Sequence, residues 1–336
     1  MDWKLLPKNT TPPHGKRIAS DYVCPRWLMG AHAQTLWPFL QPRAKVARRR
    51  ERIATPDGDF WDFDWLCAPA KDGAPLVVLF HGLEGNSHSH YACSMMAAVA
   101  RRGWRGVVPH FRGCSGELNL KPRAYHMGDH SEIAAMLDAV RARIPEQTVL
   151  YAAGVSLGGG ALLNWLGRSG KDASNTLSAA AAVSTPIDLE RSACVFGEGF
   201  NRFYERNFMG TLKPKALEMA RRHPDKLSLK KIAAARTLND FDNALTAPLH
   251  GFEDATDYRR RASSRPWLGK IETPTLLLNA LNDPLAPGDC LPDEKETSPC
   301  LLLEFSDKGG HAGFPSVGKN SWMPQRVLNF FEQHPS

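Results

Sequence analysis

The segment Thr148-Val-Leu-Tyr-Ala-Ala-Gly-Val-Ser-Leu-Gly-Gly-Gly160 joins an apolar run to a helical pattern through Gly154-Val155-Ser156-Leu157-Gly158. This order predicts a strand, a sharp turn and a helix, with Ser156 at the turn and its hydroxyl exposed. Glycines suit positions 154 and 158 because a side chain there would collide with the neighbouring strand or helix. A serine held in this way is a candidate nucleophile if a base lies beside it.

The pentapeptide alone is weak evidence. A chain of this length with average glycine and serine usage contains Gly-x-Ser-x-Gly by accident roughly one time in ten. The alternative interpretation is a glycine-rich strand–helix turn without a catalytic role. The rest of the chain therefore has to provide the partners of the serine.

Apolar runs and amphipathic patterns alternate on both sides of this segment. Strands are predicted at Arg52–Ala54, Phe60–Leu66, Pro75–Phe80, Trp104–Phe111, Thr148–Ala153, Ala179–Val183, Thr275–Asn279 and Cys300–Phe305, and helices at Ser87–Arg102, Asp129–Arg143, Leu157–Leu166 and Pro324–Gln333. Alternating strands and helices predict an α/β fold with a mostly parallel central sheet flanked by helices.

Composition changes divide the chain into four parts. Residues 1–50 are rich in proline and aromatic residues and are expected to form an extended N-terminal arm on the body. Residues 51–185 form the first part of the α/β core. Residues 186–266 are polar, basic and mostly helical, with the clearest helices at Leu212–Arg222 and Ser228–Arg236, and are expected to form a helical lid. Residues 267–336 return to strand–helix alternation as the second part of the core.

A candidate acid and a candidate base each follow a predicted strand. Asp283 follows Thr275–Asn279, and His311 lies in Gly309-Gly-His-Ala-Gly-Phe314 after Cys300–Phe305. Catalytic groups in such sheets lie at the carboxyl ends of the strands. The imidazole of His311 would take the Ser156 proton, and Asp283 would orient the ring and stabilise its charged form. Asp289 and Asp307 are rival acids, Asp283 could simply begin a turn, and His311 could be an ordinary loop histidine.

Backbone N–H groups near the serine could stabilise an oxyanion. The N–H of Leu157 follows the nucleophile directly, and Leu83, in His81-Gly82-Leu83-Glu84-Gly85, is the expected second donor. The loss of one such donor typically costs 2.7–4 kcal/mol of transition-state stabilisation.

Bulk composition narrows the function classes. The 336 residues are 43% hydrophobic, with a net charge of +7, and no apolar run approaches the roughly 20 residues of a membrane-spanning helix. The basic run Lys45–Arg52 lacks interleaved aromatic residues, so we expect a solvated face and no nucleic-acid partner, with at most weak peripheral contact with an anionic membrane. Scattered, odd-numbered cysteines and a start without a long apolar stretch favour a cytoplasmic protein. Histidine spacing predicts no metal site.

Several further motifs resemble the YheT-like branch of the α/β-hydrolases, also called the AB-hydrolase-4 family. They are Gly30-Ala-His-Ala-Gln-Thr35, Thr55-Pro-Asp-Gly-Asp-Phe-Trp-Asp-Phe-Asp-Trp65, Phe80-His-Gly-Leu-Glu-Gly-Asn-Ser-His-Ser-His-Tyr91, Phe111-Arg-Gly-Cys-Ser-Gly-Glu117, Ser184-Thr-Pro-Ile-Asp-Leu189 and Asn282-Asp-Pro284, together with the two segments that contain Ser156 and His311. Gly160 departs from the pattern, where an asparagine is expected, and so does Leu285, where an aromatic residue is more usual.

The resemblance implies a serine hydrolase that cleaves carboxylic esters of small molecules or lipids, with Ser156, Asp283 and His311 as its triad and with no cofactor. Acyl transfer or thioester cleavage on the same triad stays open, and so does a catalytically silent binding protein. Phe196, Phe200 and Phe203 are candidates for substrate binding, although lid packing explains them equally well. The sequence does not fix the oligomeric state.

Overall fold

The computed structural model describes residues 14–316 and 321–335. Its strands are β1 (Lys16–Ile18), β2 (Arg48–Ala54), β3 (Phe60–Leu66), β4 (Leu76–Phe80), β5 (Arg105–Pro109), β6 (Leu150–Val155), β7 (Ala179–Val183), β8 (Thr275–Ala280) and β9 (Leu301–Ser306). They form one sheet in the order β1-β9-β8-β7-β6-β4-β5-β3-β2. Among the described residues, only the β2–β3 and β3–β5 pairs are antiparallel. The predicted mostly parallel sheet is therefore confirmed.

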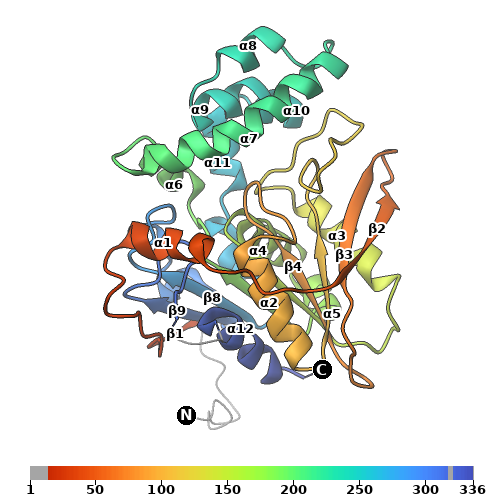
Figure 1. Cartoon of the computed structure of the whole chain (residues 1–336), viewed down its shortest axis with the longest axis vertical. Helices are drawn as coiled ribbons and strands as arrows, with labels where there is room; N and C mark the ends of the chain where they lie inside the picture. The colour runs from red at the N-terminus through yellow and green to blue at the C-terminus, as the bar shows by residue number, and fades with distance from the viewer. Residues whose placement is uncertain (1–13, 317–320, 336) are drawn as a thin grey trace.

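Helices cover both faces of the sheet (Figure 1). They are α1 (Ala31–Leu40), α2 (His90–Arg101), α3 (His130–Arg141), α4 (Leu157–Ser169), α5 (Lys171–Thr176) and α12 (Trp322–Glu332). Alternate residues of β4 point to opposite faces, as the strand period requires. Val77 and Leu79 pack with α2 and α12, whereas Val78 and Phe80 pack with α3 and α4. The central strands are buried on both sides and are apolar for that reason.

Residues 186–266 form a helical segment between β7 and β8. Its elements are α6 (Leu189–Phe196), α7 (Asn201–Arg222), α8 (Leu229–Ala234), α9 (Leu238–Phe241), the π-helical η2 (Asp242–Thr246), α10 (Ala247–His250) and α11 (Ala255–Ala262). The short 3-10 helix η3 (Arg265–Lys270) leads from this segment to β8, and η4 (Gly288–Cys290) and η5 (Glu294–Glu296) lie between β8 and β9. The segment has its own apolar cluster, which Leu83, Leu118 and Ala124 from the core contact. In Figure 1 the helices from α7 to α11 lie at one end of the sheet.

The N-terminal region differs from the expected extended arm. Lys16–Ile18 extends the sheet as β1, parallel to β9. Ala31–Leu40 is a helix in which Gln34 and Thr35 are buried. The sequence prediction missed this helix because its polar residues face inward, opposite to the usual amphipathic pattern.

Two arginines of the basic run at Lys45–Arg52 are paired with carboxylates across the β2–β3 ladder. Arg50 lies opposite Asp64 and Arg52 opposite Asp62, and each guanidinium makes two hydrogen bonds of 2.7–2.9 Å to its carboxylate. These bidentate pairs offset the charges of Arg50 and Arg52.

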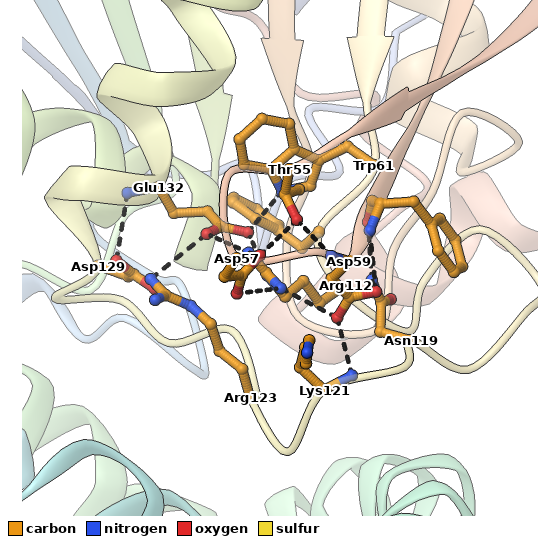
Figure 2. A network of polar contacts seen from close by, with 12 residues as sticks. Thr55, Asp57, Asp59, Trp61, Arg112, Asn119, Lys121, Arg123, Asp129 and Glu132 are labelled. Atoms are coloured by element: carbon orange, nitrogen blue, oxygen red, sulfur yellow. Dashed lines mark hydrogen bonds and ion pairs between the residues drawn. The ribbon is translucent and has the colours of Figure 1, made fainter.

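A buried polar network fixes the loop that follows β5. The Arg112 side chain lies 3.0 Å from carboxylate oxygens of Asp57 and Asp59 and 2.8 Å from Glu132 (Figure 2). Asn119 donates to Asp59 as well. The loop is thus tied to the β2–β3 turn and to α3, and this matters because the loop lines a cavity beside the candidate site.

Candidate active site

Ser156 lies at the sharp turn between β6 and α4. Its φ of 55° is rare for a non-glycine residue and marks a strained backbone. A Cβ at Gly154 would lie 2.5 Å from the Gly158 carbonyl oxygen, and one at Gly158 would lie 2.4 Å from that of His81. The chain can fold back so closely only because both positions are glycine.

Three side chains from distant segments meet at this turn. The Oγ of Ser156 lies 2.9 Å from Nε2 of His311, and Nδ1 of the same ring lies 3.0 and 2.9 Å from the two carboxylate oxygens of Asp283. Because a carboxylate only accepts hydrogen bonds, Nδ1 must carry the proton and donate a hydrogen bond to Asp283. Nε2 is then unprotonated and can accept a hydrogen bond from the serine hydroxyl. Asp283 is 3% exposed, and its Oδ1 also accepts from the backbone N–H groups of Leu285 and Ala286. The rival acid Asp289 instead pairs with Arg191 at the surface.

Two residues of α1 hold the histidine loop, and the sequence analysis did not single out either. The Oγ1 of Thr35 accepts from the His311 N–H at 2.9 Å. The Oε1 of Gln34 accepts from Gly309 N–H and from Asn282 Nδ2, both at 2.9 Å. The only sequence feature that points to these two residues is the motif Gly30–Thr35, which is one of the motifs shared with the family. The motif by itself does not indicate that its residues support the histidine loop.

The turn after β4 brings backbone N–H groups close to the serine. A Cβ at Gly82 would lie 3.1 Å from the Ser156 Cβ, so the absence of a side chain permits this approach. The N–H groups on either side of Leu83, at Gly82 and Glu84, each donate at 2.8 Å to the hydroxyls of Tyr91 and Tyr125 respectively. Leu157 is the first residue of α4, so its N–H has no partner within the helix. Both Leu83 and Leu157 line the same cavity.

His81 stiffens the same turn as a neutral ring. Its Nε2 accepts from the Phe111 N–H at 3.1 Å, so Nδ1 carries the proton and donates to the Gly82 carbonyl at 2.8 Å. Burial, together with the neighbouring His110, lowers the pKa of His81 to about 3. His81 therefore stays uncharged near neutral pH, which suits a structural role.

Two cavities adjoin the site. One, of about 430 Å³, contains Ser156 and His311 and has Leu36, Phe39 and Phe203 on its walls. The second, of about 140 Å³, lies beyond Leu83 and is mostly apolar, with Leu157 and Phe196 among its walls. The three phenylalanines singled out in the sequence are thus separated: Phe196 and Phe203 line different cavities, whereas Phe200 is 49% exposed and packs on His32.

The two departures from the family pattern have local explanations. A Cβ at Gly160 would lie 2.3 Å from the Met127 sulfur, so this methionine occupies the space that a larger residue would need. Leu285 is buried and lines the larger cavity, where an aromatic residue would reduce the volume.

Two features are absent from the described residues, 14–316 and 321–335. No cluster of three or more His, Cys, Asp or Glu side chains has the arrangement of a metal site. No helix within those ranges combines the length and apolarity needed to cross a bilayer.

The chain is similar to known proteins over most of its length. Residues 75–316 match the model of the α/β-hydrolase fold family. The YheT protein of Escherichia coli K12, which carries a provisional esterase name, is 35% identical over 95% of this chain and 94% of its own. The human phospholipase ABHD3 is 28% identical, covering 90% of this chain and 75% of its own.

A solved structure agrees on the fold. The esterase Pf2001 of Pyrococcus furiosus superposes with a TM-score of 0.58 and 15% identity, covering 96% of this chain and 100% of its own. Since the family model covers more than half of the chain and YheT aligns along almost all of it, this protein belongs to the YheT-like branch of the α/β-hydrolases.

Proposed function

We propose that this protein is a serine hydrolase that cleaves carboxylic esters through an acyl-Ser156 intermediate. The observation that carries the proposal is the hydrogen-bonded series from Ser156 through His311 to Asp283. The names of the relatives, an esterase and a phospholipase, support ester hydrolysis in general.

In the first half of the reaction, His311 Nε2 accepts the Ser156 proton as Oγ attacks the ester carbonyl carbon. The carbonyl oxygen gains the electron pair and accepts hydrogen bonds from the N–H groups of Leu83 and Leu157. The tetrahedral species collapses, the C–O bond to the alcohol breaks, and His311 returns the proton to the leaving alkoxide. Asp283 stabilises the imidazolium that exists between these two transfers.

In the second half, water replaces the alcohol. His311 takes one proton from the water, the hydroxide attacks the acyl carbon, and Ser156 leaves with the proton that His311 returns. The products are a carboxylic acid, an alcohol and the free enzyme. An alcohol in place of water would give a new ester, so acyl transfer is the alternative outcome of the same intermediate.

The cavity walls favour an ester with apolar groups. Phe39, Phe203 and Leu285 surround the space at Ser156. Apolar surface buried there contributes roughly 25 cal/mol per Å² to binding. We therefore propose small-molecule or lipid esters with aliphatic or aromatic substituents as substrates.

The test is hydrolysis of p-nitrophenyl butyrate by wild type, Ser156→Ala and Ser89→Ala. Ser89 lines the same cavity and is the matched control. We expect kcat to fall by about 10⁴-fold or more in Ser156→Ala and to change little in Ser89→Ala. A fluorophosphonate should label the wild type and not Ser156→Ala. Equal rates in wild type and Ser156→Ala would remove the serine from the mechanism.

A further inference from the structure

The helix α1 is apolar on its exposed side and polar on its buried side. Its sequence Ala-His-Ala-Gln-Thr-Leu-Trp-Pro-Phe-Leu contains no Asp, Glu, Lys or Arg. Gln34 and Thr35 are 0% and 3% exposed, whereas Phe39 and Leu40 are 57% and 74% exposed. A helix on a water-facing surface normally has the opposite arrangement, with charged residues outside. The buried polar residues Gln34 and Thr35 are explained by their hydrogen bonds to the loop that carries His311. The exposed apolar residues have no such partner role and need a separate explanation.

More exposed apolar side chains belong to the segment before this helix and to the helical segment. Trp27 and Met29, just before α1, are 60% and 68% exposed. The ring of Trp27 packs on Trp37 of α1 with centroids 4.7 Å apart. From the helical segment, Phe200 and Phe203 are 49% and 54% exposed.

Contacts join these two groups of residues into one surface. His32 of α1 lies against the Phe200 ring at 4.6 Å, and its Nδ1 is 3.2 Å from the Tyr204 hydroxyl. Figure 1 shows α1 near the start of α7, in agreement with these contacts. We call this surface the apolar rim; it consists of Trp27, Met29, Phe39, Leu40, Phe200 and Phe203. Scattered exposed apolar residues need no explanation, but a contiguous group does.

The apolar rim borders the cavity that contains the candidate nucleophile. Phe39 from α1 and Phe203 from α7 belong both to the rim and to the walls of that cavity, together with Ser156 and His311. An ester that leaves a lipid phase at the rim could therefore reach Ser156 along apolar walls. A protein partner bound stably over the same surface would instead cover the approach.

Cations adjoin the rim. Arg26 directly precedes Trp27, Arg43 follows Leu40 by three residues, and Arg202 and Arg206 lie on either side of Phe203 in sequence. All four are exposed, and among residues 14–316 and 321–335 none of them takes part in an ion pair. Unpaired arginines beside exposed aromatic and aliphatic residues complement an anionic lipid surface, with apolar side chains inserted and guanidinium groups at the headgroups.

We infer that the apolar rim is a docking surface for anionic lipid bilayers, from which the protein takes its ester substrate. The inference rests on the proposed function, since it assigns the source of the substrate for the same site. The docking surface lies elsewhere than the basic run at Lys45–Arg52, which the sequence singles out. In that run Arg50 and Arg52 pair with Asp64 and Asp62, whereas the four arginines at the rim form no ion pair with the described residues.

The test uses the full chain and vesicles of phosphatidylcholine with or without phosphatidylglycerol. Met29→Ser/Leu40→Ser removes two rim side chains that do not line the catalytic cavity. Leu120→Ser/Leu229→Ser is the matched control, because these leucines are 57% and 44% exposed and lie outside the rim. We expect the rim variant to bind phosphatidylglycerol vesicles about tenfold more weakly than wild type, and the control variant to bind as wild type does. Vesicles of phosphatidylcholine alone should bind wild type more weakly.

A second measurement locates the contact. Brominated phospholipids quench tryptophans that enter the bilayer, so wild-type fluorescence should fall on vesicle binding and Trp27→Leu should lose most of that quenching. Equal vesicle binding by wild type and the rim variant would overturn the inference. So would a wild-type dimer that becomes a monomer in the rim variant, because a second copy would then cover the surface.

Hydrolysis of soluble p-nitrophenyl butyrate separates this inference from the proposed function. The rim variant should retain wild-type kcat on this substrate. If the wild type does not cleave the soluble ester, the proposed function fails, whereas vesicle binding still tests the docking surface.

Discussion

The Nζ of Lys215, on α7, lies 2.8 Å from Oε2 of Glu84, the residue that follows Leu83. Glu84 has a φ of 56°, and the Tyr125 hydroxyl donates to its carboxylate at 3.0 Å. The Glu84 side chain is 7% exposed, so these two partners replace hydrogen bonds that water would otherwise provide. The helical segment is thereby connected to the turn that we propose supplies an oxyanion donor.

Removal of this ammonium should impair the reaction more than substrate binding. In Lys215→Met, the buried Glu84 loses its cationic partner and the N–H of Leu83 shifts relative to Ser156. We expect kcat on a soluble ester to fall about tenfold, below the 10²–10³-fold cost of deleting an oxyanion donor, with little change in KM. Lys215→Arg should recover most of the activity, and Lys226→Met, an exposed lysine of the same segment, is the control. A rise in KM at constant kcat would contradict a positioning role.

The orienting role of Asp283 makes a second prediction. In Asp283→Asn the side chain keeps its shape but no longer favours the Nδ1–H form of His311. We expect kcat to fall by about 10⁴-fold, with a far-ultraviolet circular dichroism spectrum like that of wild type. Asp289→Asn tests the rival acid of the sequence analysis and should retain activity, because Asp289 pairs with Arg191 at the surface. The reverse result would assign the acid to Asp289.

Much of the sheet follows from the sequence because its strands are short, buried on both faces and bounded by turn residues. The runs Pro75–Phe80 and Thr275–Asn279 predict β4 and β8 within a residue or two. The position of the candidate site follows from the same strand predictions. The carboxyl ends of parallel strands lie at one edge of the sheet, so residues that follow different strands are expected to lie close together there. That Ser156, Asp283 and His311 are catalytic stays a prediction; the structure adds the distances between them.

The parts of the fold that depend on long-range contacts do not follow from the sequence. Gln34 bonds to Gly309, a residue 275 positions away, and no local pattern reveals such a partner. The sequence predicts a helix over Leu212–Arg222, a range that contains Pro214. The observed α7 begins at Asn201 and continues through that proline. Since Pro214 lacks an N–H, the Gly210 carbonyl loses its helical donor, and the exposure of Gly210 leaves that oxygen open to water.

A third prediction tests the buried amide of α1. Gln34→Ala leaves Gly309 N–H and Asn282 Nδ2 without their acceptor, and an unsatisfied buried group costs about 1–3 kcal/mol. We expect the free energy of unfolding to fall by about that amount in urea titrations. Because the histidine loop loses a support, kcat should also fall, by about tenfold. Gln41→Ala, an exposed glutamine just after α1, should match wild type in both measurements.

Two glycine-to-alanine substitutions should change stability in opposite directions. A Cβ at Gly158 would lie 2.6 Å from the Phe80 carbonyl oxygen and 2.4 Å from that of His81, and backbone atoms cannot move aside easily. At Gly210, in α7, a Cβ would meet nothing within 4 Å. Gly158→Ala should lose about 3 kcal/mol or fail to fold, whereas Gly210→Ala should gain about 0.5–1 kcal/mol through helix propensity. Thermal unfolding measures both, and a loss of stability in Gly210→Ala would contradict the helical assignment.

The last prediction concerns acid stability. The ring of His126, 8% exposed, packs at 4.4 Å on the ring of His250 in the helical segment. Burial, followed by the effect of His250, lowers the pKa of His126 to about 3, and burial lowers that of His250 to about 4. The unfolded chain binds these protons near pH 6.5, so the stability from the neutral rings is complete above pH 6.5 and is lost as the pH falls.

From pH 6.5 to pH 5 the unfolded chain takes up protons at these two histidines while the folded protein does not, so the free energy of unfolding should fall. Asp242 acts in the opposite direction, because burial raises its pKa to about 6 and its neutral form becomes favourable as the pH falls. A comparison of variants removes that contribution, since Asp242 is present in all of them. Urea titrations at several pH values should show that His126→Gln loses less stability on acidification than wild type, whereas His88→Gln, at an exposed position, follows wild type. Parallel curves for wild type and His126→Gln would mean that His126 binds its proton equally well in the folded and the unfolded protein, so that burial does not lower its pKa.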